Sequence, residues 1–139
     1  MDKAIISKLI EAAIEAKSNS YSPYSKFAVG AAILCKDGNI YRGCNIENGA
    51  YPTSICAERV ALFKAVSEGA RKFEAIAVVG GPEGADGKAE IKDFCPPCGV
   101  CRQVLSEFCD RNFKIILANG KGEQKVFTLG ELLPESFSL

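Results

Sequence analysis

The sequence predicts an α/β protein, built as a three-layer α/β/α sandwich around a mixed sheet of about five strands. Helical and strand-like segments alternate along the chain, and strand–helix–strand units with right-handed crossovers place helices on both faces of one sheet. The chain has 139 residues, which fits a single domain, 1–139, long enough to bury a core without disulfides.

The first half of the chain predicts one helix followed by two strands. Residues 3–17 place apolar side chains on one helical face and charged ones mostly elsewhere, which is typical of an amphipathic helix. Residues 18–25 are a polar loop. The apolar run 27–35 and the segment 40–44 flank the turn signal Asp37-Gly38-Asn39, so we expect a β-hairpin there.

The second half of the chain predicts further helices and strands. A helix begins near Cys56 and runs to about Glu68, where Gly69 ends it. The remaining expected segments are a buried strand at 75–79, a Gly-rich loop at 80–87, a helix at about 98–110, strands at 114–118 and 125–127, and a short element at 129–133.

The charge balance disfavours several classes of partner. Lys and Arg number 17, Asp and Glu also number 17, and the formal net charge is +0. Proteins that grip phosphates usually carry a basic excess, so we expect no nucleic acid partner. No stretch is long and apolar enough to span a bilayer, and the charged N-terminal pattern is unlike a signal peptide. We therefore expect a cytoplasmic protein with no membrane partner.

The cysteine and histidine content limits the possible chemistry. Seven cysteines, an odd number without an export signal, argue against a disulfide framework. The chain has no histidine, which excludes catalysis by a Ser-His or Cys-His pair. Any zinc site must therefore use thiolates or carboxylates.

Three cysteines have spacings that suit one zinc ion. Cys98 and Cys101 are three residues apart at the start of an expected helix, and Cys56 starts another. Catalytic zinc keeps three protein ligands and an open fourth position, whereas structural zinc is closed by four. Cys95 is the candidate fourth ligand, but the stiff Pro96-Pro97 segment favours its being a spare thiol. Both possibilities stay open from the spacing alone.

Glu58 is the candidate proton carrier. It follows Cys56 by two residues, and within a first helical turn both side chains can overhang the helix end and approach one ion. The alternative is a solvent-facing or capping glutamate. A capping box would need Ser or Thr three residues earlier, where Ile55 stands, which weakens that alternative.

Several motifs together resemble one family of enzymes. Cys56-Ala57-Glu58, followed by Pro97-Cys98-Gly99-x-Cys101-Arg102-Gln103, resembles the paired signature of the cytidine deaminase family, in its small three-cysteine branch. Ala28 departs from members that have proline there. Further matching segments cover nearly the whole chain: Tyr24-Ser25-x-Phe27-x-Val29-Gly30-Ala31-Ala32, Gly43-x-Asn45-Ile46-Glu47-Asn48 and Leu132-Leu133-Pro134-x-x-Phe137.

The resemblance implies an activity and a cofactor. Cys56, Cys98 and Cys101 would bind one Zn²⁺ per chain, and Glu58 would carry protons between water, the pyrimidine ring and the leaving amino group. The reaction would be hydrolytic deamination of cytidine and 2′-deoxycytidine to uridine and 2′-deoxyuridine plus ammonia, in pyrimidine salvage. Arg59 resembles the family arginine that donates to ligand sulfurs, which would offset the excess charge of three thiolates; a surface arginine is the alternative.

The resemblance also implies contacts with a small-molecule nucleoside substrate. Phe27 would pack on the pyrimidine, Asn45 and Glu47 would bind ribose hydroxyls, and Ala57 would offer backbone groups to the base. Without the family pattern, a core phenylalanine and a polar loop explain the first three equally well or better. The resemblance implies a homotetramer in which Phe137 reaches into a neighbouring site, although a tail phenylalanine packed on its own core is simpler.

Three rival functions share some of these features. Blasticidin-S deaminase has the same zinc motifs, but Phe27 and the pair Asn45 and Glu47 favour a plain nucleoside here. A non-catalytic zinc module would use Cys95 as the fourth ligand. A nucleic-acid-editing deaminase is disfavoured by the balanced charge and short chain.

Overall fold

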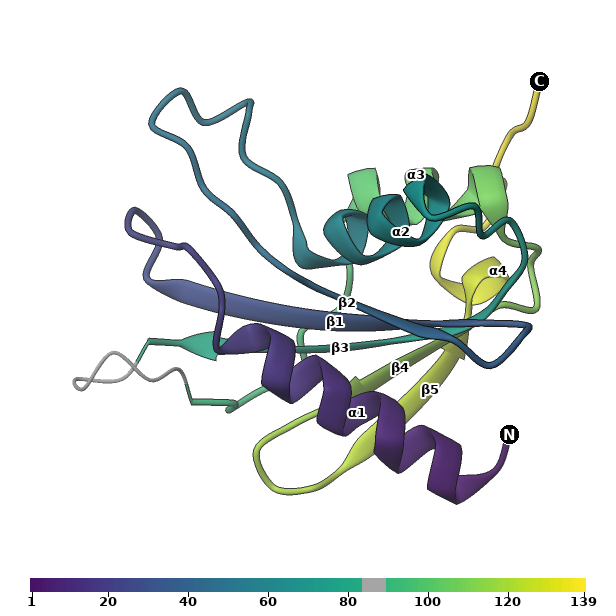
Figure 1. Cartoon of the computed structure of the whole chain (residues 1–139), viewed down its shortest axis with the longest axis horizontal. Helices are drawn as coiled ribbons and strands as arrows, with labels where there is room; N and C mark the ends of the chain where they lie inside the picture. The colour runs from purple at the N-terminus through teal and green to yellow at the C-terminus, as the bar shows by residue number, and fades with distance from the viewer. Residues whose placement is uncertain (84–89) are drawn as a thin grey trace.

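The computed structural model describes residues 1–83 and 90–139 (Figure 1). In chain order its elements are α1 (Lys3–Lys17), β1 (Phe27–Cys35), β2 (Ile40–Cys44), α2 (Ala57–Ser67), β3 (Phe73–Pro82), α3 (Gly99–Phe108), β4 (Lys114–Ala118), β5 (Gln124–Thr128) and α4 (Leu129–Leu132). No helix among the described residues is long and apolar enough to cross a membrane.

The strands form one mixed five-stranded sheet in the order β2-β1-β3-β4-β5. β1 pairs antiparallel with both β2 and β3, β3 pairs parallel with β4, and β4 pairs antiparallel with β5. A parallel pair needs a crossover connection, and α3 lies on the connection between β3 and β4. The predicted mixed sheet of about five strands is confirmed.

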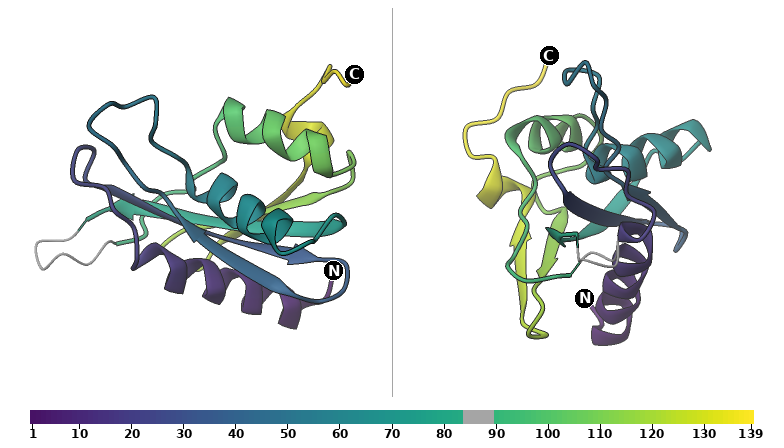
Figure 2. Two further views of the ribbon diagram at one scale, coloured as in Figure 1. Left: turned by 45° about the horizontal axis from the view of Figure 1, so that its top comes forward. Right: turned by 90° about the vertical axis from the view of Figure 1, so that its left-hand side faces the viewer.

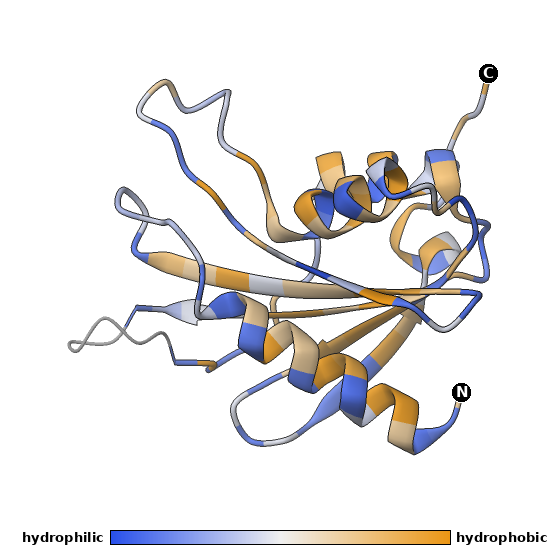
Figure 3. Ribbon diagram, viewed as in Figure 1, coloured by the Kyte–Doolittle hydropathy of each residue, from blue (hydrophilic) through white to orange (hydrophobic). Residues whose placement is uncertain are grey.

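The sheet is the middle of three layers, as predicted. α1 covers one face, whereas α2, α3 and α4 lie over the other (Figures 1 and 2). Side chains of β1 alternate between the two cores: Ala32 and Leu34 pack with Leu9 of α1, whereas Ile33 packs with Leu62 of α2. Because both faces are buried, the central strands are hydrophobic along most of their length (Figure 3).

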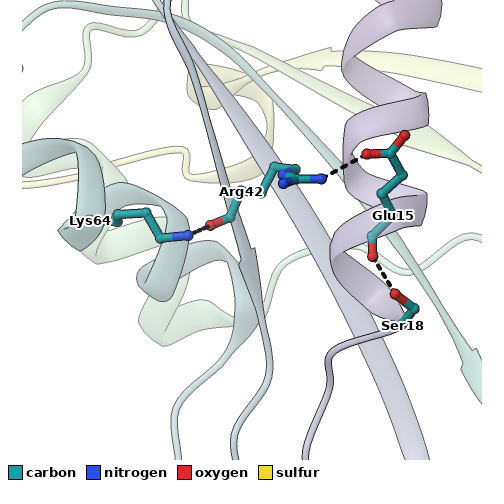
Figure 4. Close-up of polar contacts among 4 residues, drawn as sticks. All are labelled: Glu15, Ser18, Arg42 and Lys64. Atoms are coloured by element: carbon teal, nitrogen blue, oxygen red, sulfur yellow. Dashed lines mark hydrogen bonds and ion pairs between the residues drawn. The ribbon is translucent and has the colours of Figure 1, made fainter.

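The edge strand β2 is connected to helices on both faces. Arg42 Nη1 forms an ion pair of 2.7 Å with Glu15 of α1, and its backbone carbonyl accepts from Lys64 of α2 (Figure 4). Both members of the ion pair are largely exposed, so it contributes at most about 1 kcal/mol. Gly43 has a larger effect on how α2 packs against β2, because a Cβ there would lie 2.4 Å from the backbone nitrogen of Ala61. Glycine therefore lets the α2 backbone lie directly on β2.

The predicted elements all form, with corrections to their ends. β3 continues through Gly80–Pro82, which we expected to be loop, because these residues extend the antiparallel pairing with β1. Of the rest of the expected Gly-rich loop, Glu83 directly follows the strand, and 84–87 lie outside the described residues. α2 and α3 each begin one residue later than predicted, because Cys56 and Cys98 are their N-caps.

Replacing Gly43 by alanine tests whether α2 depends on this close approach. The new Cβ would clash with the backbone of Ala57 and Ala61, so we expect Gly43→Ala to lower the free energy of unfolding by about 1–3 kcal/mol. The matched control is Gly130→Ala, whose Cβ would meet only the flexible Arg111 side chain. Urea denaturation of both variants measures the difference; equal stabilities would contradict the account.

Candidate metal centre

Two helix N-termini bring the three predicted cysteine ligands together. Cys56 is the N-cap of α2, Cys98 is the N-cap of α3, and Cys101 lies in the first turn of α3. Neither N-cap side chain makes a capping hydrogen bond, so both sulfurs are free to bind an ion. Helix N-termini also favour negative charge, which stabilises the thiolate forms.

The distances between the sulfurs suit zinc. All three Sγ atoms lie within 4.8 Å of one another, and those of Cys56 and Cys98 are 3.8 Å apart. Tetrahedral zinc with Zn–S bonds of about 2.3 Å places its sulfurs about 3.8 Å apart. Within residues 1–83 and 90–139 no other group of three potential ligands is this close. The three cysteines therefore fit one zinc ion.

Cys95 stays out of this cluster. Its Sγ lies where a Cβ on Gly80 would meet it at 2.8 Å, beside the end of β3. Burial, and secondarily the negative charges of Glu58 and Cys56, raise the pKa of the Cys95 thiol to about 11. A protonated thiol outside the cluster does not close the site, so the structure favours three ligands and an open fourth position.

Glu58 is buried beside the sulfurs. Its side chain lies in the first turn of α2 and is 4% exposed. Burial, and then the negative charge of Cys56, raise the pKa of the Glu58 carboxyl to about 7. A carboxyl group with a pKa in this range can both accept and donate a proton near neutral pH.

Arg59 lies against the same sulfurs. Its Nη2 donates a hydrogen bond to Cys56 Sγ at 3.4 Å. Hydrogen bonds from Cys101, Arg59 and Cys98 lower the pKa of Cys56 below that of a free thiol, which favours its thiolate form. The Nε of Arg59 is buried without a hydrogen-bond partner among the described residues. Arg59 is therefore half-buried and in contact with a candidate ligand sulfur, which favours a role at the metal site over that of a surface arginine.

A pocket of about 340 Å³ opens next to the cluster, within the size range of small-ligand sites. Its walls combine the metal-binding residues with residues from the loops on either side. The lining residues are Val29, Asn45, Glu47, Ser54, Ile55, Cys56, Ala57, Glu58, Arg59, Cys95, Pro96 and Cys98.

Asn45 and Glu47 line this pocket and also brace the surrounding loops. Asn45 Oδ1 accepts from the Val29 N–H at 2.9 Å, and its Nδ2 donates to the Phe27 carbonyl at 2.8 Å. Glu47 Oε1 accepts from the backbone N–H groups of Tyr24 and Ser25. Although partial burial opposes the shift, a hydrogen bond with the Ser25 side chain and these two backbone hydrogen bonds lower the pKa of Glu47. Asn45 and Glu47 therefore both hold the polar loop in place and line the pocket.

The two phenylalanines lie differently. Phe27 is 40% exposed, and its ring edge lies beside Gly80 and Cys95, next to the pocket rather than in its wall. Phe137 is 68% exposed in the C-terminal tail, which extends away from the sheet (Figure 2). The simpler alternative for Phe137, packing on its own core, is therefore not formed.

Some pocket residues were not singled out from the sequence. Val29, Ser54 and Ile55 line the pocket only because β1 and the loop before α2 meet there. Pro96 was recognised for its stiffness but not as part of the wall. Arg102 belongs to a motif in the sequence, but its side-chain contacts with other segments form only in the folded chain.

Comparisons with known proteins agree with this geometry. Residues 3–117 match the family described as the cytidine and deoxycytidylate deaminase zinc-binding region. A cytidine deaminase of Sporosarcina psychrophila is 50% identical over 133 residues, covering 96% of this chain and 91% of that protein. The crystal structure of a cytidine deaminase from Burkholderia pseudomallei superposes with a TM-score of 0.84 at 42% identity, covering 99% of this chain and 100% of that one. A blasticidin-S deaminase of Bacillus cereus is 34% identical, covering 94% of this chain and 91% of that protein.

Zinc content of cysteine variants distinguishes an open site from a closed one. We expect one zinc per chain in the wild type and in Cys95→Ser, because Cys95 lies outside the sulfur cluster. Cys98→Ser should lose most of its zinc, because thiolate is the preferred ligand and only two would remain. Metal analysis after gel filtration in a weak chelator measures both. Loss of zinc from Cys95→Ser would show that Cys95 is a fourth ligand and that the site is closed and structural.

Proposed function

The chain belongs to the cytidine and deoxycytidylate deaminase family, and on that premise we propose that it is a zinc-dependent hydrolase that converts cytidine to uridine and ammonia. The observation that carries the proposal is the three-sulfur cluster with the buried Glu58 beside it, at the wall of a pocket of nucleoside size. We extend the proposal to 2′-deoxycytidine as a second substrate and to pyrimidine salvage as the role.

The metal would be held by Cys56, Cys98 and Cys101. When bound there, zinc would supply a nucleophile near neutral pH, because it would lower the pKa of a water molecule in the pocket. Three thiolates and one Zn²⁺ leave one net negative charge, which opposes this effect. The Arg59 guanidinium, in contact with Cys56 Sγ, offsets that charge together with the two helix N-termini.

Glu58 would move the protons of the reaction. Its carboxylate would take up two protons in turn, one from the attacking water and one from the hydroxyl group of the resulting adduct. It would pass the first to ring N3 and the second to the amino group, which leaves as ammonia. The raised pKa of about 7 suits both directions of transfer, since neither the acid nor the carboxylate form is strongly favoured at neutral pH. The burial that raises the pKa also excludes bulk water from this proton path.

The remaining pocket residues would hold the nucleoside. The backbone of Ala57, at the N-terminus of α2, would contact the base, and Phe27 at the pocket edge would pack on its ring. Glu47 accepts from backbone N–H groups through Oε1, and its carboxylate is part of the pocket wall, which suits it to accept from a ribose hydroxyl as well. Asn45 retains one amide hydrogen beyond its bond to the Phe27 carbonyl, which suits the same role.

A reducing compartment and an oligomer complete the proposal. Seven free cysteines and a three-thiolate site require reduced thiols, which supports a cytoplasmic location. The exposed Phe137 and the exposed pair Tyr24 and Tyr51 are large apolar side chains of the kind that subunit interfaces cover. We therefore propose a homotetramer in which Phe137 enters a neighbouring pocket.

Blasticidin-S deamination is the second candidate, because one relative carries that name at 34% identity. The pocket favours the plain nucleoside for two reasons. The most similar relatives named above are cytidine deaminases at 42–50% identity. Glu47 also places a carboxylate in the pocket wall, and a carboxylate accepts hydrogen bonds from ribose hydroxyls.

Glu58→Gln tests the activity directly. The amide cannot accept the proton, so we expect ammonia release from cytidine to fall at least about a thousandfold while one zinc per chain remains. The matched control is Glu107→Gln, an exposed residue of α3 outside the pocket, which should retain wild-type activity. An ultraviolet assay with cytidine, 2′-deoxycytidine and blasticidin S, with zinc counted in the same samples, gives both results. Full activity in Glu58→Gln would contradict the proposed role of Glu58. A wild-type protein that deaminates blasticidin S but not cytidine would contradict the proposed substrate.

Mixed oligomers test whether Phe137 acts across a subunit boundary. Phe137→Ala should raise KM for cytidine, because the pocket loses an aromatic wall. When Phe137→Ala and Glu58→Gln chains are co-expressed, the second supplies an intact Phe137 to a neighbour that keeps Glu58. We expect kcat/KM per intact Glu58 to recover in the mixture, measured on tetramers purified through two tags. No recovery, or a monomeric wild type in sedimentation, would contradict the proposal.

A further inference from the structure

Arg102 joins two parts of the chain that meet only in the folded protein. It lies in α3, directly after the ligand Cys101. Its Nε donates to the carbonyl of Pro97 at 2.8 Å, and its Nη1 donates to the carbonyl of Leu132 in α4 at 2.8 Å. One guanidinium therefore connects the segment just before Cys98 to the last helix.

Cys98 is the most exposed of the three candidate ligands. Cys101 is fully buried and shares its helix face with the buried Leu105, so packing fixes it. Cys98 is exposed and lies outside the regular helix as its N-cap, with no side-chain cap. The two residues before it are prolines, which have no N–H to donate to the rest of the fold. Their carbonyls are the backbone hydrogen-bonding groups that can anchor this segment.

The other end of the bridge is firmly fixed. α4 begins with a capping box between Thr128 and Glu131, and its first residue, Leu129, is buried in the core. The N–H of Leu129 also donates to the Phe113 carbonyl at 2.8 Å, next to β4. The Leu132 carbonyl is at the C-terminal end of α4, where helix carbonyls lack helical partners and favour a cation.

We propose that Arg102 is a positioning residue for the metal site, which holds Cys98 in its binding position by tying the Pro97 carbonyl to the end of α4. This inference rests on the proposed zinc site but assigns a role beyond the ligands and Arg59. Arginine suits the role because its planar guanidinium presents donors in fixed directions to two acceptors at once. Lysine carries the same charge on a single nitrogen and cannot reproduce that rigid bridge.

The rate of zinc release measures this role without using the enzyme activity. We expect Arg102→Ala and Arg102→Lys each to release zinc to a chromogenic chelator about ten- to a hundredfold faster than the wild type, as is usual when a residue supporting a ligand is lost. Weaker binding should also shrink the rise in melting temperature that zinc produces over the metal-free protein. Arg111→Ala is the matched control, because Arg111 contacts the same C-terminal segment, at Gly130 and Ser136, but not the loop before Cys98.

Each outcome separates this inference from its rivals. Zinc release within twofold of the wild type in Arg102→Ala would overturn it. Wild-type release in Arg102→Lys would show that the charge matters and the bridge does not, which also overturns it. A third outcome is that Arg111→Ala accelerates zinc release as much as Arg102→Ala does, with melting temperatures that fall equally with and without zinc. That result would overturn the proposal, because it would show that Arg102 contributes only to the general stability of the fold. A wild type that binds no zinc would instead contradict the proposed function.

Discussion

The structure depends on holding three sulfur atoms, from segments 42 residues apart, within 4.8 Å of one another. Thiolates at this distance repel one another, so the site must supply positive charge around them. Two helix N-termini and the Arg59 guanidinium provide it within the protein, and a zinc ion completes the balance. The same concentration of charge acts on Glu58, whose carboxyl is buried beside Cys56 and therefore keeps its proton up to about neutral pH.

The fold meets this requirement through the order of its strands. The antiparallel pair β1 and β2 carries α2, which Gly43 allows to lie against the sheet, so Cys56 has a fixed position. The parallel pair β3 and β4 needs a crossover, and α3 begins within that crossover at Cys98. Both helices lie on the same face of the sheet, so their N-termini can meet at one point (Figure 1). The opposite face packs against α1 and forms the second hydrophobic core.

The sequence predicts much of this arrangement because the important signals are local. The spacing of Cys98 and Cys101, the absence of histidine and the position of Glu58 all concern residues near one another or overall composition. The predicted end of β3 is wrong because Gly80 and Gly81 suggest a turn. In the structure, the missing side chain of Gly80 makes room for Phe27 and Cys95, and that of Gly81 makes room for the backbone of Glu90. The bridge made by Arg102 could not be predicted, because Pro97 and Leu132 come together only through the packing of α4.

X-ray absorption at the zinc edge reports the atoms around the metal without reference to activity, so it distinguishes an open site from a closed one. We expect three sulfur neighbours at about 2.3 Å and one oxygen at about 2.0 Å in the wild-type protein. Cys95→Ser should give the same spectrum, because its sulfur lies outside the cluster. Four sulfur neighbours, with one lost in Cys95→Ser, would show a closed structural site and contradict the account.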